Sequence, residues 1–148
     1  MSRRIKILCS ARRLRRDLLL LLVIASSPAF AQSSASLRAC NQNARSQAEL
    51  NACANEEATR AERDLHRVYT RLLAQASSQP EAVEKIKAAE KAWLSYRDAY
   101  LEAMYPAADK QAEYGTIYPM EANLLRAKLA RQHIFDLKEM LRHDDGSK

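Results

Sequence analysis

The stretch that decides the fold runs from Cys40 to Leu73 and reads CNQNARSQAELNACANEEATRAERDLHRVYTRLL. From Leu50 onward its apolar residues recur at intervals of three and four, which places them on one face of a helix. Ser46 and Glu49 have the spacing of a capping box, in which a hydroxyl and a carboxylate satisfy backbone N–H groups at a helix start. The pattern predicts a helix over residues 46–76, preceded by an irregular lead-in over residues 32–45.

Two further segments show the same helical period. SSQP at 77–80 breaks the first helix, and apolar residues then repeat at three and four until Tyr105-Pro106. The residue before a proline avoids the α region, so the second helix is predicted over 80–105. Ser78 and Glu81 have the spacing of a second capping box.

The third helix is predicted over about 118–142, after a linker at 106–116 with room for a short helical turn. No segment alternates as a strand would. The sequence therefore predicts an all-α protein, an antiparallel three-helix bundle whose first two helices form a long hairpin.

Residues 1–31 have the features of a cleaved secretory signal: a basic start, a short apolar run at 18–25, and small residues at Ala29 and Ala31. The apolar run is shorter than the roughly 20 residues that span a bilayer. We expect cleavage near Ala31, a periplasmic or secreted protein without a membrane span, and one domain over 32–148.

Charge separates the two parts of the chain. The net charge is +6, but seven of the 24 basic and one of the 18 acidic residues precede Gln32, so residues 32–148 carry 17 of each. A nucleic-acid-binding domain should show a basic surplus. The balance argues against that class.

Cys40 and Cys53 admit four interpretations. A lipid anchor fits poorly, because Arg38 stands where a small residue is wanted. A zinc site usually uses cysteines two to four residues apart, and a redox pair uses Cys-x-x-Cys. In an oxidising compartment the remaining interpretation, a disulfide, is favoured. An unbroken helix would hold the two Cα atoms roughly 19–20 Å apart, so the chain must turn back between them, and we place the turn at 41–43.

With ELNACA and AWLSYRDA in view, the chain resembles the LprI family, named after a lysozyme-inhibiting lipoprotein. The resemblance covers nearly all of residues 32–148. The matching positions are Cys40, Gln47, Leu50, Asn51, Cys53, Ala54, Leu65, Tyr69, Leu72, Trp93, Tyr96, Arg97, Asp98 and Ala99. Many relatives carry two further cysteines where this chain has Leu101 and Leu125, so the linker between them is expected to be held less firmly here.

The resemblance implies a non-catalytic helical protein that binds a protein partner, with lysozyme the first candidate. The predicted partner surface is in the 106–116 linker, at Asp109, Lys110, Glu113 and Tyr114. The alternative is a structural or chaperone-like envelope protein. An inhibitor should expose aromatic residues at a loop end, whereas a chaperone-like protein should expose a strip of them along a helical face.

The family-motif residues Trp93, Tyr96, Arg97 and Asp98 are given structural roles. The aromatic residues, with Tyr100, are expected in the core, and Arg97 or Asp98 is expected to pair with a neighbouring helix or to cap a backbone group. Arg131 is expected to pair with Asp98 or with an acid of the first helix. No nucleophile–base arrangement stands out, and no cofactor or metal is expected; the histidines and acids near the end of the chain are assigned to a polar tail.

Overall fold

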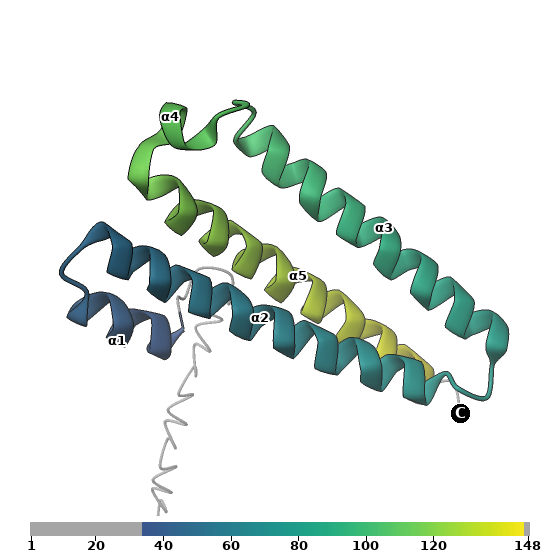
Figure 1. Cartoon of the computed structure of the whole chain (residues 1–148). Helices are drawn as coiled ribbons and strands as arrows, with labels where there is room; N and C mark the ends of the chain where they lie inside the picture. Colours follow the sequence, from purple (N-terminus) through teal and green to yellow (C-terminus); the bar gives the residue numbers. More distant parts are fainter. Residues whose placement is uncertain (1–33, 147–148) are drawn as a thin grey trace, which may run out of the picture. The chain divides into compact units, whose positions relative to one another are not determined.

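The computed structural model describes residues 34–146, which fold into helices without a strand (Figure 1). The signal predicted for residues 1–31 lies outside this described part. The elements of residues 34–146 are α1 (Ala35–Asn43), α2 (Gln47–Gln75), α3 (Pro80–Met104), α4 (Lys110–Tyr114), the 3-10 helix η1 (Gly115–Ile117) and α5 (Tyr118–Gly146). The all-α prediction is confirmed.

The start of α2 is set by the predicted capping box. The Ser46 hydroxyl accepts a hydrogen bond from the backbone N–H of Glu49 at 3.2 Å. The Glu49 carboxylate in turn accepts from the backbone N–H of Arg45, one residue before the cap. Both ends of the motif therefore satisfy backbone donors that the helix itself leaves unpaired.

The start of α3 differs from its prediction. Gln79 occupies the N-cap position and makes no side-chain capping bond, so Ser78 and Glu81 form no capping box. Pro80 supplies the start instead, because its fixed φ suits the first helical position and its missing N–H costs nothing there. α3 ends at Met104, just before Tyr105-Pro106, as predicted.

The lead-in prediction for residues 32–45 is wrong, because α1 occupies most of that segment. The Ser34 hydroxyl caps α1 by accepting from Leu37 N–H at 3.0 Å, and the Leu37 side chain is buried. A helix this short is marginal by itself and has too few apolar residues to show a period. The chain turns back at 44–46, where Ala44 is extended, and not at 41–43.

The closest packing of the fold is between α2 and α5, which run in the same direction. Gln47, at the start of α2, contacts Met120 near the start of α5, and Gln75, at its end, donates to the Leu141 carbonyl at 3.2 Å. The buried core includes Ala58, Ala61, Leu65, Ala127, Ala130 and Leu137.

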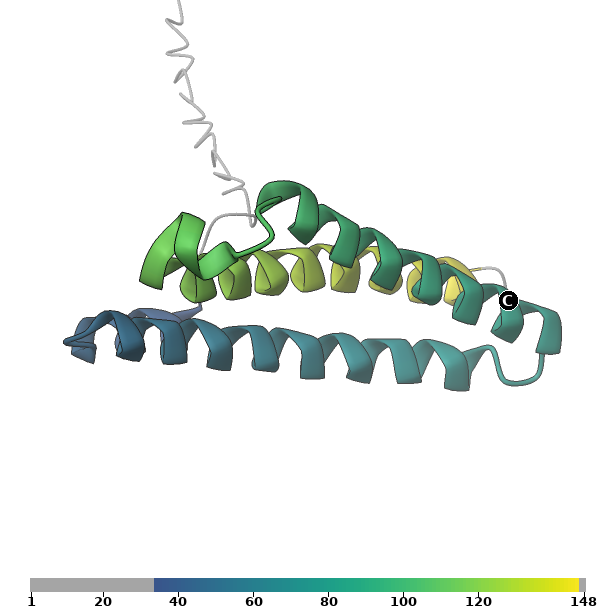
Figure 2. The same ribbon diagram turned by 45° about the horizontal axis from the view of Figure 1, so that its top comes forward.

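α3 runs back in the opposite direction and lies more loosely on this pair (Figures 1 and 2). Ile86 is the one residue of α3 that is buried. α3 follows α2 and runs back in the opposite direction, as the predicted hairpin requires. However, α2 packs mainly against α5 and not against α3. Among residues 34–146, no helix has the length and apolar character needed to cross a membrane.

Candidate functional site

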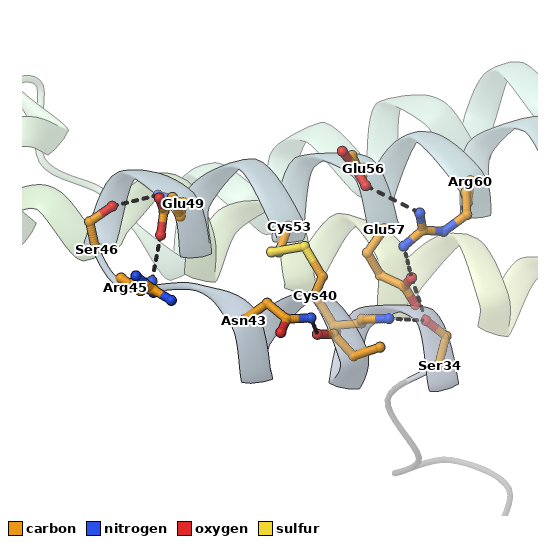
Figure 3. The surroundings of a disulfide bond; sticks show 12 residues. Ser34, Cys40, Asn43, Arg45, Ser46, Glu49, Cys53, Glu56, Glu57 and Arg60 are labelled. Carbon is orange, nitrogen blue, oxygen red and sulfur yellow. Dashed lines mark hydrogen bonds and ion pairs between the residues drawn. A yellow bond between two sulfur atoms is a disulfide. The ribbon is translucent and has the colours of Figure 1, made fainter.

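A disulfide between Cys40 and Cys53 fastens α1 to α2 (Figure 3). The two residues are 13 positions apart in sequence, yet their Cα atoms are 5.8 Å apart, because the chain turns back after Asn43. Cys53 is buried and Cys40 is half-buried. The predicted disulfide is confirmed, and it fixes the position of Ser34 at the other end of α1.

Ser34 contributes to a buried carboxylate that joins three helices. The Ser34 hydroxyl donates to Glu57 Oε2 at 2.6 Å, and Arg60 donates to the same oxygen at 2.9 Å. Arg131 of α5 contacts the other carboxylate oxygen. Glu57 is 0% exposed, so α1, α2 and α5 meet at one fully enclosed negative charge.

The electrostatics of this carboxylate are set by opposing causes. Burial by itself raises the pKa of Glu57, but the hydrogen bonds from Ser34 and Arg60 and the charge of Arg131 outweigh burial and lower it below the usual value. The expectation that Arg131 pairs with an acid of the first long helix is confirmed. The role of Glu57 was missed, although its position between Ala54, Ala58 and Ala61 on the apolar face was a signal for it.

The predicted partner surface forms a compact end of the fold around α4. Asp109 caps α4 by accepting from the Ala112 N–H at 2.9 Å. Lys110 pairs with Glu102 of α3 at 2.8 Å, and this hydrogen bond raises the pKa of Lys110. Glu113 is exposed. The Tyr114 hydroxyl accepts from the Ala107 N–H at 3.3 Å, so Tyr114 has a structural role.

Three tyrosine rings pack on one another at the α4 end. Tyr105 meets Tyr114 and Tyr118 edge to face, with ring centroids 5.4 and 5.1 Å apart. Burial, followed by the nearby Glu121 carboxylate, raises the pKa of Tyr105. Aromatic contacts of this kind add stability beyond area burial, so the α4 end is a preformed structure.

Two positions of the family resemblance tie this end to α2. The Asn51 amide donates to the Thr116 carbonyl of η1 at 3.0 Å, and the Gln47 amide donates to Asn51 at 2.8 Å. Gly115, between α4 and η1, has φ of 69°, a left-handed conformation that suits glycine.

The motif on α3 combines one packed and one exposed aromatic residue. Trp93 stacks on His133 of α5, and the Arg97 guanidinium lies 5.7 Å from the Trp93 ring centre. Arg97 pairs with the adjacent Asp98 at 2.7 Å and not with a neighbouring helix, contrary to expectation. Tyr96 is 54% exposed and Tyr100 is also exposed, so the core prediction holds for Trp93 alone.

Comparison with known proteins identifies the family. The model of the family described as lysozyme inhibitor LprI matches residues 38–137. The chain belongs to the LprI family. This LprI protein is 30% identical over 107 residues to an uncharacterised protein of Rhizobium meliloti (strain 1021), covering 65% of this chain and 74% of the relative. No solved structure matches it.

Two open grooves lie along the α3–α5 boundary of this LprI protein. One, of about 620 Å³, is lined by Leu72, Ala76, Ala82, Ile86 and Met140, with polar residues beside them. The other, of about 560 Å³, includes Leu101, Glu102, Tyr118 and Arg126. Leu101 and Leu125 are both half-buried. Within the described residues, no three histidine, cysteine or carboxylate side chains gather in a way that could hold a metal ion.

Proposed function

We propose that this LprI protein is an exported, non-catalytic binding protein, and that lysozyme is its partner. The observation that carries the proposal is the family match over residues 38–137, which spans the disulfide, the motif on α3 and the α4 end. What the family description says of inhibition is carried to this chain as part of the proposal.

The proposed contact surface is the α4 end. Asp109 and Glu113 are exposed there, and their backbone is held by the tyrosine rings and by Asn51. A preformed surface loses little conformational entropy on binding, which favours affinity. Residues 97–126 contain five acidic and three basic side chains, so this part of the chain favours a cationic partner although residues 32–148 are neutral.

Export supports the same proposal. The disulfide needs an oxidising compartment to persist, and a secretory signal is predicted over residues 1–31. A lysozyme partner would be met in the same compartment.

The test is a lysozyme activity assay with the purified, oxidised protein of residues 32–148. We expect inhibition at micromolar protein. The Glu113→Lys variant should weaken inhibition about tenfold, because a rim charge opposite a cationic partner is reversed. The control is Glu84→Lys, which replaces an exposed acid on α3 that pairs with Lys87. Full lysozyme activity at micromolar protein would refute this proposal.

A second function is favoured by one observation. Tyr96, Tyr100 and Met104 are exposed at successive four-residue intervals along α3, with Leu94 nearby. An apolar strip on a helix is the feature expected of a chaperone-like protein, whereas the tyrosines at the α4 end pack on one another. Suppression of client aggregation, followed by light scattering and weakened in Tyr96→Ser/Met104→Ser, would support this alternative. Unchanged aggregation with the wild-type protein would remove it.

A further inference from the structure

α3 is attached to the rest of the fold by few buried side chains. Ile86 is buried, and Ala82, Val83 and Trp93 are partly buried against the core. The C-terminal half of α3 is exposed at Tyr96, Tyr100 and Met104. α2 and α5 bury their main apolar residues against each other, so their core does not depend on the whole length of α3.

Midway along α3, one cluster bridges to α5. His133 of α5 is 8% exposed, and its Nε2 atom lies 2.8 Å from Glu90 Oε2 of α3. The His133 ring stacks on Trp93, with centroids 4.1 Å apart and planes 6° apart. We name Glu90, Trp93 and His133 the latch. Removing either polar partner leaves the other enclosed without its hydrogen bond, which is costly.

The two grooves lie on either side of the latch. The first takes its α3 and pre-α3 lining from residues 79–86 and its α5 lining from residues 139–143. The second takes its lining from residues 98–102 and 118–126. Glu90 and Trp93 fall between the two sets on the α3 side, and His133 falls between them on α5. The latch therefore lies between the two grooves along both α3 and α5.

We propose that the middle of α3 is a movable arm, closed on α5 by the latch, and that it opens while α2 and α5 remain paired. Opening joins the two grooves into one continuous furrow between α3 and the α2–α5 pair. The turn at 77–79 and the tyrosine cluster around Tyr105 keep the two ends of α3 attached, so opening separates the middle of α3 from α5. This inference does not depend on the identity of the partner.

Once undocked, the middle of α3 loses the tertiary packing that gives a protein helix most of its stability, so its backbone hydrogen bonds open readily. Hydrogen exchange of backbone amides under native conditions therefore measures this opening. In the wild-type protein we expect the amides of residues 84–100 to be protected at least tenfold less than those of residues 54–72 and 124–138. Equal protection of α3 and α2 would overturn the proposal, because it would mean that the three helices open only together.

The latch is tested with Glu90→Ala, and its matched control is Glu84→Ala, an exposed glutamate on the same helix. Loss of Glu90 should raise exchange in residues 84–100 about tenfold and leave α2 and α5 unchanged. The control should change nothing beyond its own turn of helix. Faster exchange of α2 and α5 together with α3 would overturn the assignment of the latch.

A conservative variant separates the hydrogen bond from the stack. Glu90→Gln keeps an acceptor for His133, so its exchange should lie between wild type and Glu90→Ala. Trp93→Leu removes the stack and keeps an apolar side chain, and it too should speed exchange in α3 alone. If neither variant changes α3, the latch does not hold the arm.

Discussion

α2 and α3 are helices of similar length that occupy very different positions in the fold. α2 has 29 residues and buries seven of them, whereas α3 has 25 and buries only Ile86. Both show apolar residues at intervals of three and four. The difference teaches that a periodic stripe identifies the apolar face of a helix without fixing how completely a neighbour covers it.

Side-chain size accounts for much of this difference. Where α2 meets α5, both helices present alanines, including Ala58, Ala61, Ala127 and Ala130. Small residues let two helix axes approach closely, because interaxial distance depends on the side chains at the contact. α3 instead meets α5 through the large Trp93 ring, which stacks on His133, and packs on α5 less closely than α2 does.

The largest expected effect comes from truncating one large apolar side chain on each of the two helices. Leu65→Ala on α2 should lower the free energy of unfolding by about 3–4 kcal/mol, because Leu65 is enclosed by the α2–α5 core. Ile86→Ala on α3 should cost about 2 kcal/mol, since Ile86 borders the open 620 Å³ groove, where neighbours and water can relax into the space. Urea unfolding measures both, and a larger loss for Ile86→Ala would reverse the comparison.

The next effect concerns the Cys40–Cys53 disulfide, which fastens α2 to α1 and which α3 lacks. The double variant Cys40→Ser/Cys53→Ser should lower the free energy of unfolding by about 3 kcal/mol, because the disulfide restricts the unfolded chain over a loop of this length. In this variant, hydrogen exchange of backbone amides should increase more in α1 than in α3. The oxidised wild-type protein should show no free thiol from either cysteine, and two free thiols on the folded protein would contradict the disulfide.

A smaller effect, dependent on pH, is expected at Glu57. Its pKa is lowered in the folded state, so it contributes stability above the ordinary glutamate pKa, and this contribution is lost as pH falls through the folded value. Glu57→Gln should therefore cost about 2 kcal/mol at pH 7, and the difference from wild type should shrink below about pH 4. Urea unfolding at a series of pH values measures the difference.

The control for that series is the neighbouring Glu56→Gln. Glu56 pairs with Arg60 at 3.5 Å, but its side chain is exposed, so its loss should have little effect at any pH. A pH-independent difference between Glu57→Gln and wild type would contradict the ionised, hydrogen-bonded carboxylate.

The sequence predicted the features that depend on local pattern. The three long helices and the Ser46 cap follow from residue spacing, and the Cys40–Cys53 disulfide follows from spacing together with the predicted export. α1 was missed because nine residues are too few to show a period, and its stability comes from α2. The packing of α2 on α5, the burial of Glu57 and the latch were missed because each depends on which helix lies opposite, and spacing along one helix does not encode that.

The parallel arrangement of α2 and α5 has a consequence for how the protein folds. The side-chain bonds that join the two helices, or α2 to η1, link residues 64 to 74 positions apart in sequence. Closing so long a loop costs entropy before the core repays it, which slows folding relative to bundles built from adjacent helices. A ribosome must finish nearly the whole polypeptide before the main core can form, so the α2–α5 core forms only at the end of synthesis.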